Sequence, residues 1–205
     1  MNRRTDPRRI NQLFQNNGDG SFSEVAAAAG LAIGAQSWTA DFADIDNDGD
    51  LDCFIGNHNE ASQMMRNDGN GTFTEITSTS GISVAWDVIQ ALFRDFNNDG
   101  WTDLLLTGEQ QGLWMNDRDG TFTKISNPFI STSMESAAVG DLNKDGFPDI
   151  YAGYANLYNT PVSSRPDRLF LSNDNGNGFL SLTLRGRSSN RLCLLYTSPS
   201  PRDRG

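Results

Sequence analysis

The sequence has 205 residues, with 26 acidic against 16 basic side chains and a formal net charge of −10 at pH 7. This length is enough for one domain with a sizeable core, and an acidic surface repels nucleic acid and anionic membranes. No apolar run approaches the roughly 20 residues that span a bilayer, and the basic segment 1–10 has no apolar stretch behind it, so the chain as written begins without a signal peptide.

The first predicted element is a β-hairpin at residues 13–25, and its turn recurs twice further along the chain. The turns occupy residues 16–22, 67–73 and 116–122. They are rich in Asn, Asp and Gly, which tolerate the positive φ that tight hairpin loops require. Apolar residues alternate on the flanks of the third copy, as in half-buried strands. Each copy therefore predicts a β-hairpin, whereas the helix-prone stretch 26–29 is too short to stand alone.

An acidic segment alternates with these turns and lies between strand candidates. Its three copies start at residues 44, 95 and 141, so successive starts are 51 and 46 residues apart. Each repeat then reads strand, acidic loop, strand, short link, strand, hairpin, strand, and four antiparallel strands in about 50 residues make a propeller blade. We therefore expect an all-β fold, a partial β-propeller of four-stranded antiparallel blades. Three blades and a leading half-blade are too few to close the usual larger ring, so we expect an open arc with an exposed blade face.

The acidic segments are predicted to bind calcium, because positions 1, 3, 5 and 9 of each carry Asp or Asn and position 6 is glycine. Calcium takes six to eight oxygen ligands, and a turn at the glycine brings alternate oxygens to one centre. Position 7 varies in side chain, which suits a ligand from its backbone carbonyl. The predicted ligands, for about three Ca²⁺ ions, are Asp44, Asp46, Asp48, Asp50 and Asp52, then Asp95, Asn97, Asp99, Trp101 and Asp103, then Asp141, Asn143, Asp145, Phe147 and Asp149.

Two other classes of calcium-binding repeat fit the acidic segments less well. An EF-hand requires a glutamate at position 12 and flanking helices, and here position 12 is Ile55, Leu106 or Ala152 inside an apolar run. Thrombospondin-type repeats are disulfide-linked and lack long apolar strands. A solvated turn without an ion would suit a single copy. Three copies in register would each gather carboxylates that repel one another without a cation.

The three acidic loops and the Asn/Gly-rich hairpins resemble the FG-GAP/VCBS repeats of integrin-α-like propellers over residues 11–155. The resemblance implies a β-propeller, residues 1–172, with calcium in the loop between the first two strands of a blade. Residues 173–191 resemble the start of the ASPIC/UnbV domain of cartilage-acidic-protein-like secreted proteins, with Phe179 where tryptophan is expected. Residues 193–203 resemble one reading frame of a transposase adapter, so 192–205 is expected to be a non-native tail that follows a truncated reading frame.

These observations favour a calcium-binding extracellular β-propeller module that binds or adheres to a protein or carbohydrate ligand and is not an enzyme. Weak calcium sites fill outside the cell, which predicts an extracellular, cell-surface or periplasmic location. Neither nucleic acid nor membrane insertion is expected. A propeller enzyme of the lyase or glycosidase type is an alternative, but the sequence has one histidine, His58, and no convincing catalytic constellation. A cytosolic structural scaffold is the other alternative.

Cys53, in an apolar strand, is expected to be buried and inert.

Overall fold

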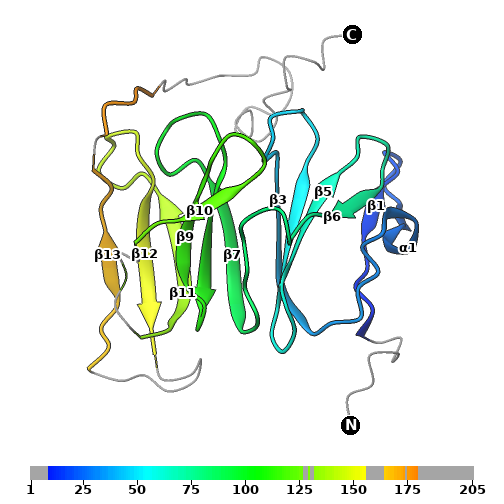
Figure 1. Cartoon of the computed structure of the whole chain (residues 1–205), viewed down its shortest axis with the longest axis horizontal. Coiled ribbons are helices and arrows are strands. Elements are labelled where there is room, and N and C mark those ends of the chain that lie inside the picture. Colours follow the sequence, from blue (N-terminus) through cyan, green and yellow to red (C-terminus); the bar gives the residue numbers. More distant parts are fainter. Residues whose placement is uncertain (1–8, 127–128, 130–131, 156–163, 174, 180–205) are drawn as a thin grey trace.

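A computed structural model of the chain describes residues 9–126, 129, 132–155, 164–173 and 175–179. The fold is all-β, and every described strand pairs antiparallel to its neighbours. Narrow sheets follow one another side by side in chain order (Figure 1). The leading hairpin joins β1 (Phe14–Asn16) to β2 (Phe22–Glu24) and matches the predicted half-blade.

Three blades follow the leading hairpin. The first two have the four strands expected from the sequence, and the described residues give the third blade three strands. The first blade is a four-stranded sheet of β3 (Ser37–Ala43), β4 (Asp52–Asn57), β5 (Gln63–Asn67) and β6 (Phe73–Glu75). The second blade comprises β7 (Val88–Arg94), β8 (Asp103–Gly108), β9 (Gly112–Asn116) and β10 (Phe122–Lys124). The third blade comprises β11 (Met134–Gly140), β12 (Asp149–Tyr154) and β13 (Arg168–Phe170). One residue pair, Met134 with Gly108, joins β11 to β8.

The second strand of a blade is its most buried strand. All six residues of β4 and all six of β8 are buried, which explains why their sequences read as continuous apolar runs instead of alternating. Both faces of these strands are covered, because the blades pack against each other. A core between the first and second blades contains Phe54 and Met64 from one side and Phe93 and Leu104 from the other.

Side-chain acceptors tie the first strands of successive blades together. Thr39 Oγ1 and Asp41 Oδ2 on β3 accept hydrogen bonds from the backbone N–H groups of Ala91 and Phe93 on β7, at 3.2 and 2.8 Å. In the same way Gln90 Oε1 on β7 accepts from the N–H of Ala137 on β11, at 2.6 Å. These bonds satisfy backbone donors that would otherwise be exposed on the edge of each blade.

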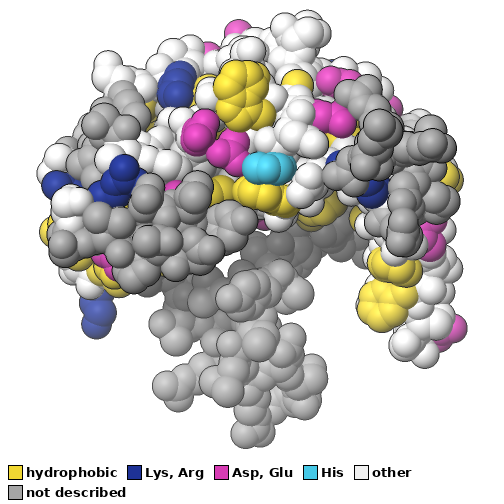
Figure 2. Space-filling model, turned by 90° about the horizontal axis from the view of Figure 1, so that it is seen from below, with side chains coloured by type: hydrophobic (Ala, Val, Ile, Leu, Met, Phe, Trp, Pro, Cys, Tyr) yellow, Lys and Arg dark blue, Asp and Glu magenta, His cyan; other side chains and the backbone are white. Residues whose placement is uncertain are grey.

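The described sheets form an open arc, as predicted. The leading hairpin and β13 lie at opposite ends of the row (Figure 1), and the described part of the molecule is arched when seen from below (Figure 2). Apolar side chains are exposed at both ends, with Phe22 at 61% on the leading hairpin and Tyr151 at 47% and Leu169 at 50% on the third blade.

The segment after the leading hairpin packs against the first blade. Ala26–Ala29 forms one turn of helix, α1, which ends at Gly30 with a left-handed φ of 80°. Its buried alanine Ala29 belongs to a small core with Cys53 and Ile55 of β4. The predicted burial of Cys53 is confirmed. Burial raises the pKa of its thiol to about 12, which disfavours the reactive thiolate. Within the described residues, no helix has the length and apolar character to cross a membrane.

Candidate metal-binding loops

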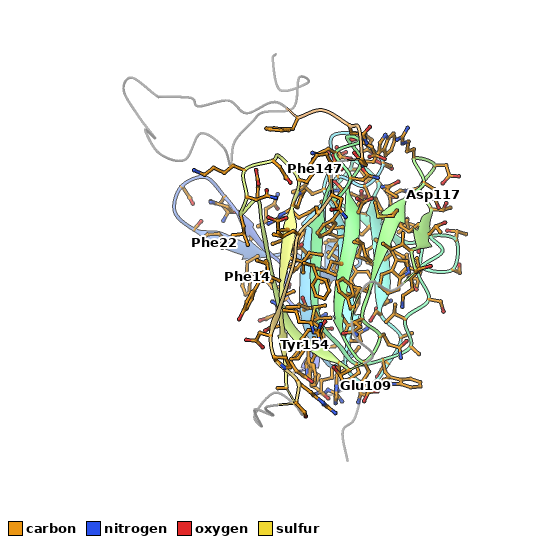
Figure 3. The ribbon with its side chains drawn as sticks, turned by 90° about the vertical axis from the view of Figure 1, so that its left-hand side faces the viewer. Phe14, Phe22, Glu109, Asp117, Phe147 and Tyr154 are labelled. Carbon is orange, nitrogen blue, oxygen red and sulfur yellow. The ribbon has the colours of Figure 1, made fainter. Side chains whose placement is uncertain are left out.

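The three acidic segments form equivalent loops between the first and second strands of their blades. We call residues 44–52 loop one, 95–103 loop two and 141–149 loop three. These loops and the hairpin turns lie at the same end of the sheets. Figure 3 shows this for Phe147 of loop three and Asp117 of the second-blade turn, while Glu109 and Tyr154 lie at the opposite end. The described end of the sheets that holds these loops and turns therefore carries all three acidic segments.

The same hydrogen bonds shape each loop, and loop two shows them clearly. The two oxygens of Asp95, at position 1, accept from the N–H groups of Asp99 and Gly100, at 3.1 and 2.8 Å. Asn97 Oδ1, at position 3, also accepts from the Asp99 N–H at 2.9 Å. Asp99 Oδ1 in turn accepts from the Trp101 N–H at 2.9 Å. The equivalent bonds in loops one and three measure between 2.8 and 3.2 Å.

Two left-handed residues curl each loop around its centre. The glycine at position 6 has a φ between 86° and 96° in the three loops. Position 4 is also left-handed, with φ values of 59°, 55° and 63° at Asn47, Asn98 and Lys144. Asparagine tolerates this region better than most residues, and lysine does so at some cost. With this backbone, the side chains at positions 1 and 3 of each loop both accept from the position-5 N–H.

The oxygens of loop one converge as a metal site requires. Asp44, Asp46 and Asp48 each offer a carboxylate oxygen, and these oxygens lie within 4.8 Å of one another. Burial raises the pKa of Asp46, and the negative charges of Asp48 and Asp44 add to the rise. Carboxylate and amide oxygens on a glycine-containing loop fit a hard divalent cation such as Ca²⁺. Loops two and three have Asn97 and Asn143 at position 3 and an aromatic residue at position 7, so each carries two carboxylates fewer than loop one.

The position-9 aspartates have a different environment from the other acidic residues. Asp52, Asp103 and Asp149 are at most 1% exposed. Asp103 accepts from the backbone N–H of Phe96 in its own loop and of Asn116 at the end of β9, both at 2.9 Å. Asp52 and Asp149 make the equivalent pairs of bonds. Each position-9 carboxylate therefore braces its loop to the third strand of the blade, a role that the sequence did not indicate.

The side chains at position 7 differ between the loops. Phe147 is buried in loop three, whereas Asp50 and Trp101 are half-buried. What the three residues share is a backbone N–H that donates to the position-5 carboxylate. That position 7 contributes its backbone carbonyl to a metal ion stays a prediction from the sequence.

Neighbouring loops are linked directly. The side-chain amide of Asn47 in loop one donates to the carbonyl of Gly100 in loop two at 3.2 Å. Asn98 of loop two donates to the carbonyl of Gly146 in loop three at 2.9 Å. The position-4 asparagine of one loop thus holds the position-6 glycine of the next. Loop three has Lys144 at position 4.

A fourth turn, which was not predicted from the sequence, follows β13 within residues 172, 173 and 175–179 and repeats contacts of the three hairpin turns. Ser172 takes the place of the leading asparagine, because its N–H donates to Asp149 as that of Asn116 does to Asp103. Gly176 has a φ of 88°, close to the 85° of Gly120. The Asn177 N–H also donates to Asn175 Oδ1 at 3.0 Å, as in the other turns. This turn spans the boundary at 172/173 that was placed from the sequence. Residues 180–191 of the ASPIC/UnbV-like segment and the tail 192–205 lie outside the described residues.

The calcium-free protein is expected to lose stability as the pH rises from about 4 to about 6. Burial, together with nearby negative charges, raises the pKa of Asp52 and of Asp103 from 3.8 to about 6. The folded protein then binds these protons at a higher pH than the unfolded chain, so stability is greatest below about pH 4 and levels off above about pH 6 for these two groups.

This pH dependence can be measured by thermal melting of protein that has been stripped with a chelator and desalted. The melting temperature should be roughly 3–6 °C higher at about pH 5 than at about pH 7. Asp103→Asn should reduce the difference, because the amide does not titrate. A melting temperature that rises with pH across this range would contradict the expectation.

Comparison with protein families gave matches over most of the chain. An FG-GAP-like repeat model matches residues 4–55, 45–106 and 95–152. An FG-GAP repeat model matches residues 135–179 and so includes the turn at Ser172. A comparison with curated proteins found no match.

Proposed function

The chain belongs to the FG-GAP-like repeat family, and on this basis we propose that it is a calcium-binding β-propeller module that acts outside the cell, binds a protein or carbohydrate ligand and catalyses no reaction. The observation that carries the calcium proposal is the convergence of Asp44, Asp46 and Asp48 in a loop whose hydrogen bonds recur in two further blades. FG-GAP repeats commonly bind calcium, which supports the same assignment.

Each ion would be held by the side-chain oxygens at positions 1, 3 and 5 and by the carbonyl at position 7. Position 9 would brace the loop and add oxygen ligands where its lone pairs permit. Calcium, when bound, supplies the positive charge that offsets the repulsion between these carboxylates. The chain's own part is to hold the oxygens in place through the loop backbone and so to join the first and second strands of each blade.

The remaining parts of the proposal rest on chemistry and not on a bound partner. Millimolar calcium outside the cell suits sites of this kind, and the net charge of −10 disfavours nucleic acid as a ligand. His58 stacks on Trp38 with ring centroids 3.8 Å apart, and its Nδ1 lies 2.9 Å from Asp87 Oδ1. These contacts give the histidine a structural role. The resemblance of residues 173–191 to an ASPIC/UnbV segment remains part of the proposal.

Calcium is expected to raise the thermal stability of the protein. At a free concentration ten times the Kd, one site contributes about 1.4 kcal/mol, which corresponds to roughly 3–5 °C in a domain of this size. Thermal melting in EDTA, in about 2 mM Ca²⁺ and in about 2 mM Mg²⁺ measures the effect and its selectivity. Asp46→Asn should reduce the calcium-induced shift. Identical melting temperatures in EDTA and in calcium would refute the proposal.

A further inference from the structure

One basic side chain reaches into the second acidic loop from the neighbouring hairpin turn. Arg118, in the turn between β9 and β10, places Nη2 at 2.9 Å and Nε at 3.3 Å from Asp99 Oδ2. The Asp99 side chain is 8% exposed, and the Arg118 side chain is 58% exposed. A nearly buried carboxylate at position 5 of loop two is therefore already paired with a cation from the protein.

The equivalent position in the two preceding turns has no side chain. Gly18 and Gly69 take this place, with φ values of 81° and 73°, and Arg118 keeps the same backbone with a φ of 68°. A long side chain is strained at such a φ, and glycine is not. The turn at 116–122 therefore carries an arginine at a position whose backbone disfavours a side chain. Its contact with Asp99 is the compensating interaction that the structure shows.

The guanidinium competes with a metal ion for the same oxygen. Asp99 Oδ1 accepts from the Trp101 N–H, and Oδ2 accepts from Arg118 and, at 3.2 Å, from the Asn97 amide. An ion that binds Asp99 through Oδ2 shares this oxygen with the guanidinium, and the repulsion between the two cations weakens the binding of the ion. Loop one has no equivalent of this contact, because Gly69 in the turn at 67–73 stands where the turn at 116–122 has Arg118.

The structure also leaves room for the guanidinium to move. A cavity of about 360 Å³ between the first and second blades is lined by Arg118, Trp101, Asp46 and Arg66, among others. Arg118 is mostly exposed, so its release from Asp99 requires no rearrangement of the core. The exchange of one cation for another can therefore take place within the folded loop.

We propose that Arg118 serves as a built-in cation of loop two, so that one negative charge of this loop is offset without calcium and the loop is the weakest of the three calcium sites. The inference rests on the proposed calcium function. An exposed arginine paired with a nearly buried carboxylate should weaken calcium binding at loop two by about five- to tenfold, from the strength of charge-assisted hydrogen bonds.

The test follows the backbone N–H resonances of Gly49, Gly100 and Gly146 in ¹⁵N-labelled protein during a titration with calcium. Each glycine belongs to one loop and donates to its position-1 aspartate, so each reports the occupancy of its own site. In the wild type, the Gly100 midpoint should lie at about five- to tenfold higher calcium than the Gly146 midpoint, because loops two and three carry the same side chains at positions 1, 3, 5 and 9. Arg118→Gln should bring the Gly100 midpoint to within about twofold of the Gly146 midpoint, while Gly49 reports loop one, which has two more carboxylates.

Matched variants separate the contact from a general change of charge. Arg66→Gln removes another exposed arginine of the same cavity, one whose Nη2 lies 3.7 Å from Asp68, and should leave the Gly100 midpoint unchanged. Arg118→Lys keeps the charge and should stay close to the wild type. Arg118→Gly introduces the glycine that the two preceding turns have at this position. It should give the same Gly100 midpoint as Arg118→Gln, and it replaces Arg118→Gln in the test if Arg118→Gln folds poorly.

The outcomes distinguish this inference from the calcium function itself. If Gly49 and Gly146 respond to calcium but the Gly100 midpoint is the same in the wild type and in Arg118→Gln, the role of Arg118 is overturned and the function stands. If none of the three resonances responds in the wild type, the calcium function fails and the inference fails with it.

Discussion

Replacing Asp103 by alanine is expected to lower the free energy of unfolding by about 3 kcal/mol, even when calcium has been removed. The Asp103 side chain is fully buried, and its two oxygens accept from the backbone N–H groups of Phe96 and Asn116. Alanine would leave both donors without this acceptor, and it would also leave a cavity. Both effects destabilise the folded state. A buried donor without a partner loses its hydrogen bonds to water and gains none in the protein, and a cavity removes packing contacts.

The measurement is urea or thermal unfolding in the presence of a chelator, so that an effect on metal binding does not enter. Asp119→Ala is the matched control. Asp119 is exposed and accepts from Thr121 within its own turn, so its removal should cost less than about 1 kcal/mol. Asp103→Asn should be intermediate, because one of its two polar atoms still accepts. If Asp103→Ala and Asp119→Ala were equally stable, the bracing role of position 9 would be wrong.

Replacing Gly108 by alanine is expected to destabilise the protein by about 3–5 kcal/mol. This is the largest effect expected of any glycine-to-alanine substitution in the described strands. Gly108 ends β8 with a φ of 103°, and an added Cβ would overlap the carbonyl oxygen of Asp87. The residue pairs with Val88 on one side and with Met134 of the third blade on the other. The backbone cannot retreat from the methyl group without breaking one of these pairings.

A second glycine in the same pair of blades provides the control. Gly140 ends β11, has no positive φ, and has no atom within 4 Å of the place where a Cβ would lie. Gly140→Ala should therefore change the free energy of unfolding by less than about 1 kcal/mol, and in the stabilising direction. Thermal melting of the two variants should differ by roughly 10 °C. Similar melting temperatures would show that the crowded junction at Gly108 can relax.

The strand order and the position of the loops could be predicted because their determinants are local. Glycine and asparagine with positive φ define the turns, and β4 and β8 read as continuous apolar runs because both of their faces are covered. The acidic loops were recognised from the spacing of their oxygens. In loop one the structure brings the oxygens of Asp44, Asp46 and Asp48 together.

The contacts that the sequence did not reveal are made by backbone groups or across long separations. The Asp149 carboxylate holds the N–H of Ser172, 23 residues away. Any residue except proline offers a backbone N–H. The turn motif was searched for by its first asparagine, so the fourth turn, which begins with Ser172, was not predicted. The pairing of Arg118 with Asp99 bridges 19 residues. The presence of Arg118 where the other two turns have glycine could have indicated this ion pair from the sequence.

The bond from each position-4 asparagine to the next position-6 glycine has a consequence for how such a protein can grow. Asn47 and Asn98 each extend a carboxamide forward, and Gly100 and Gly146 each present a carbonyl backward. A duplicated copy of one whole repeat would bring both a position-4 carboxamide and a position-6 carbonyl. It could therefore be inserted between existing blades and still form this bond with each neighbour. A partial copy would break the series. An unbroken series of these bonds therefore requires complete repeats, each with its own position-4 amide and position-6 carbonyl.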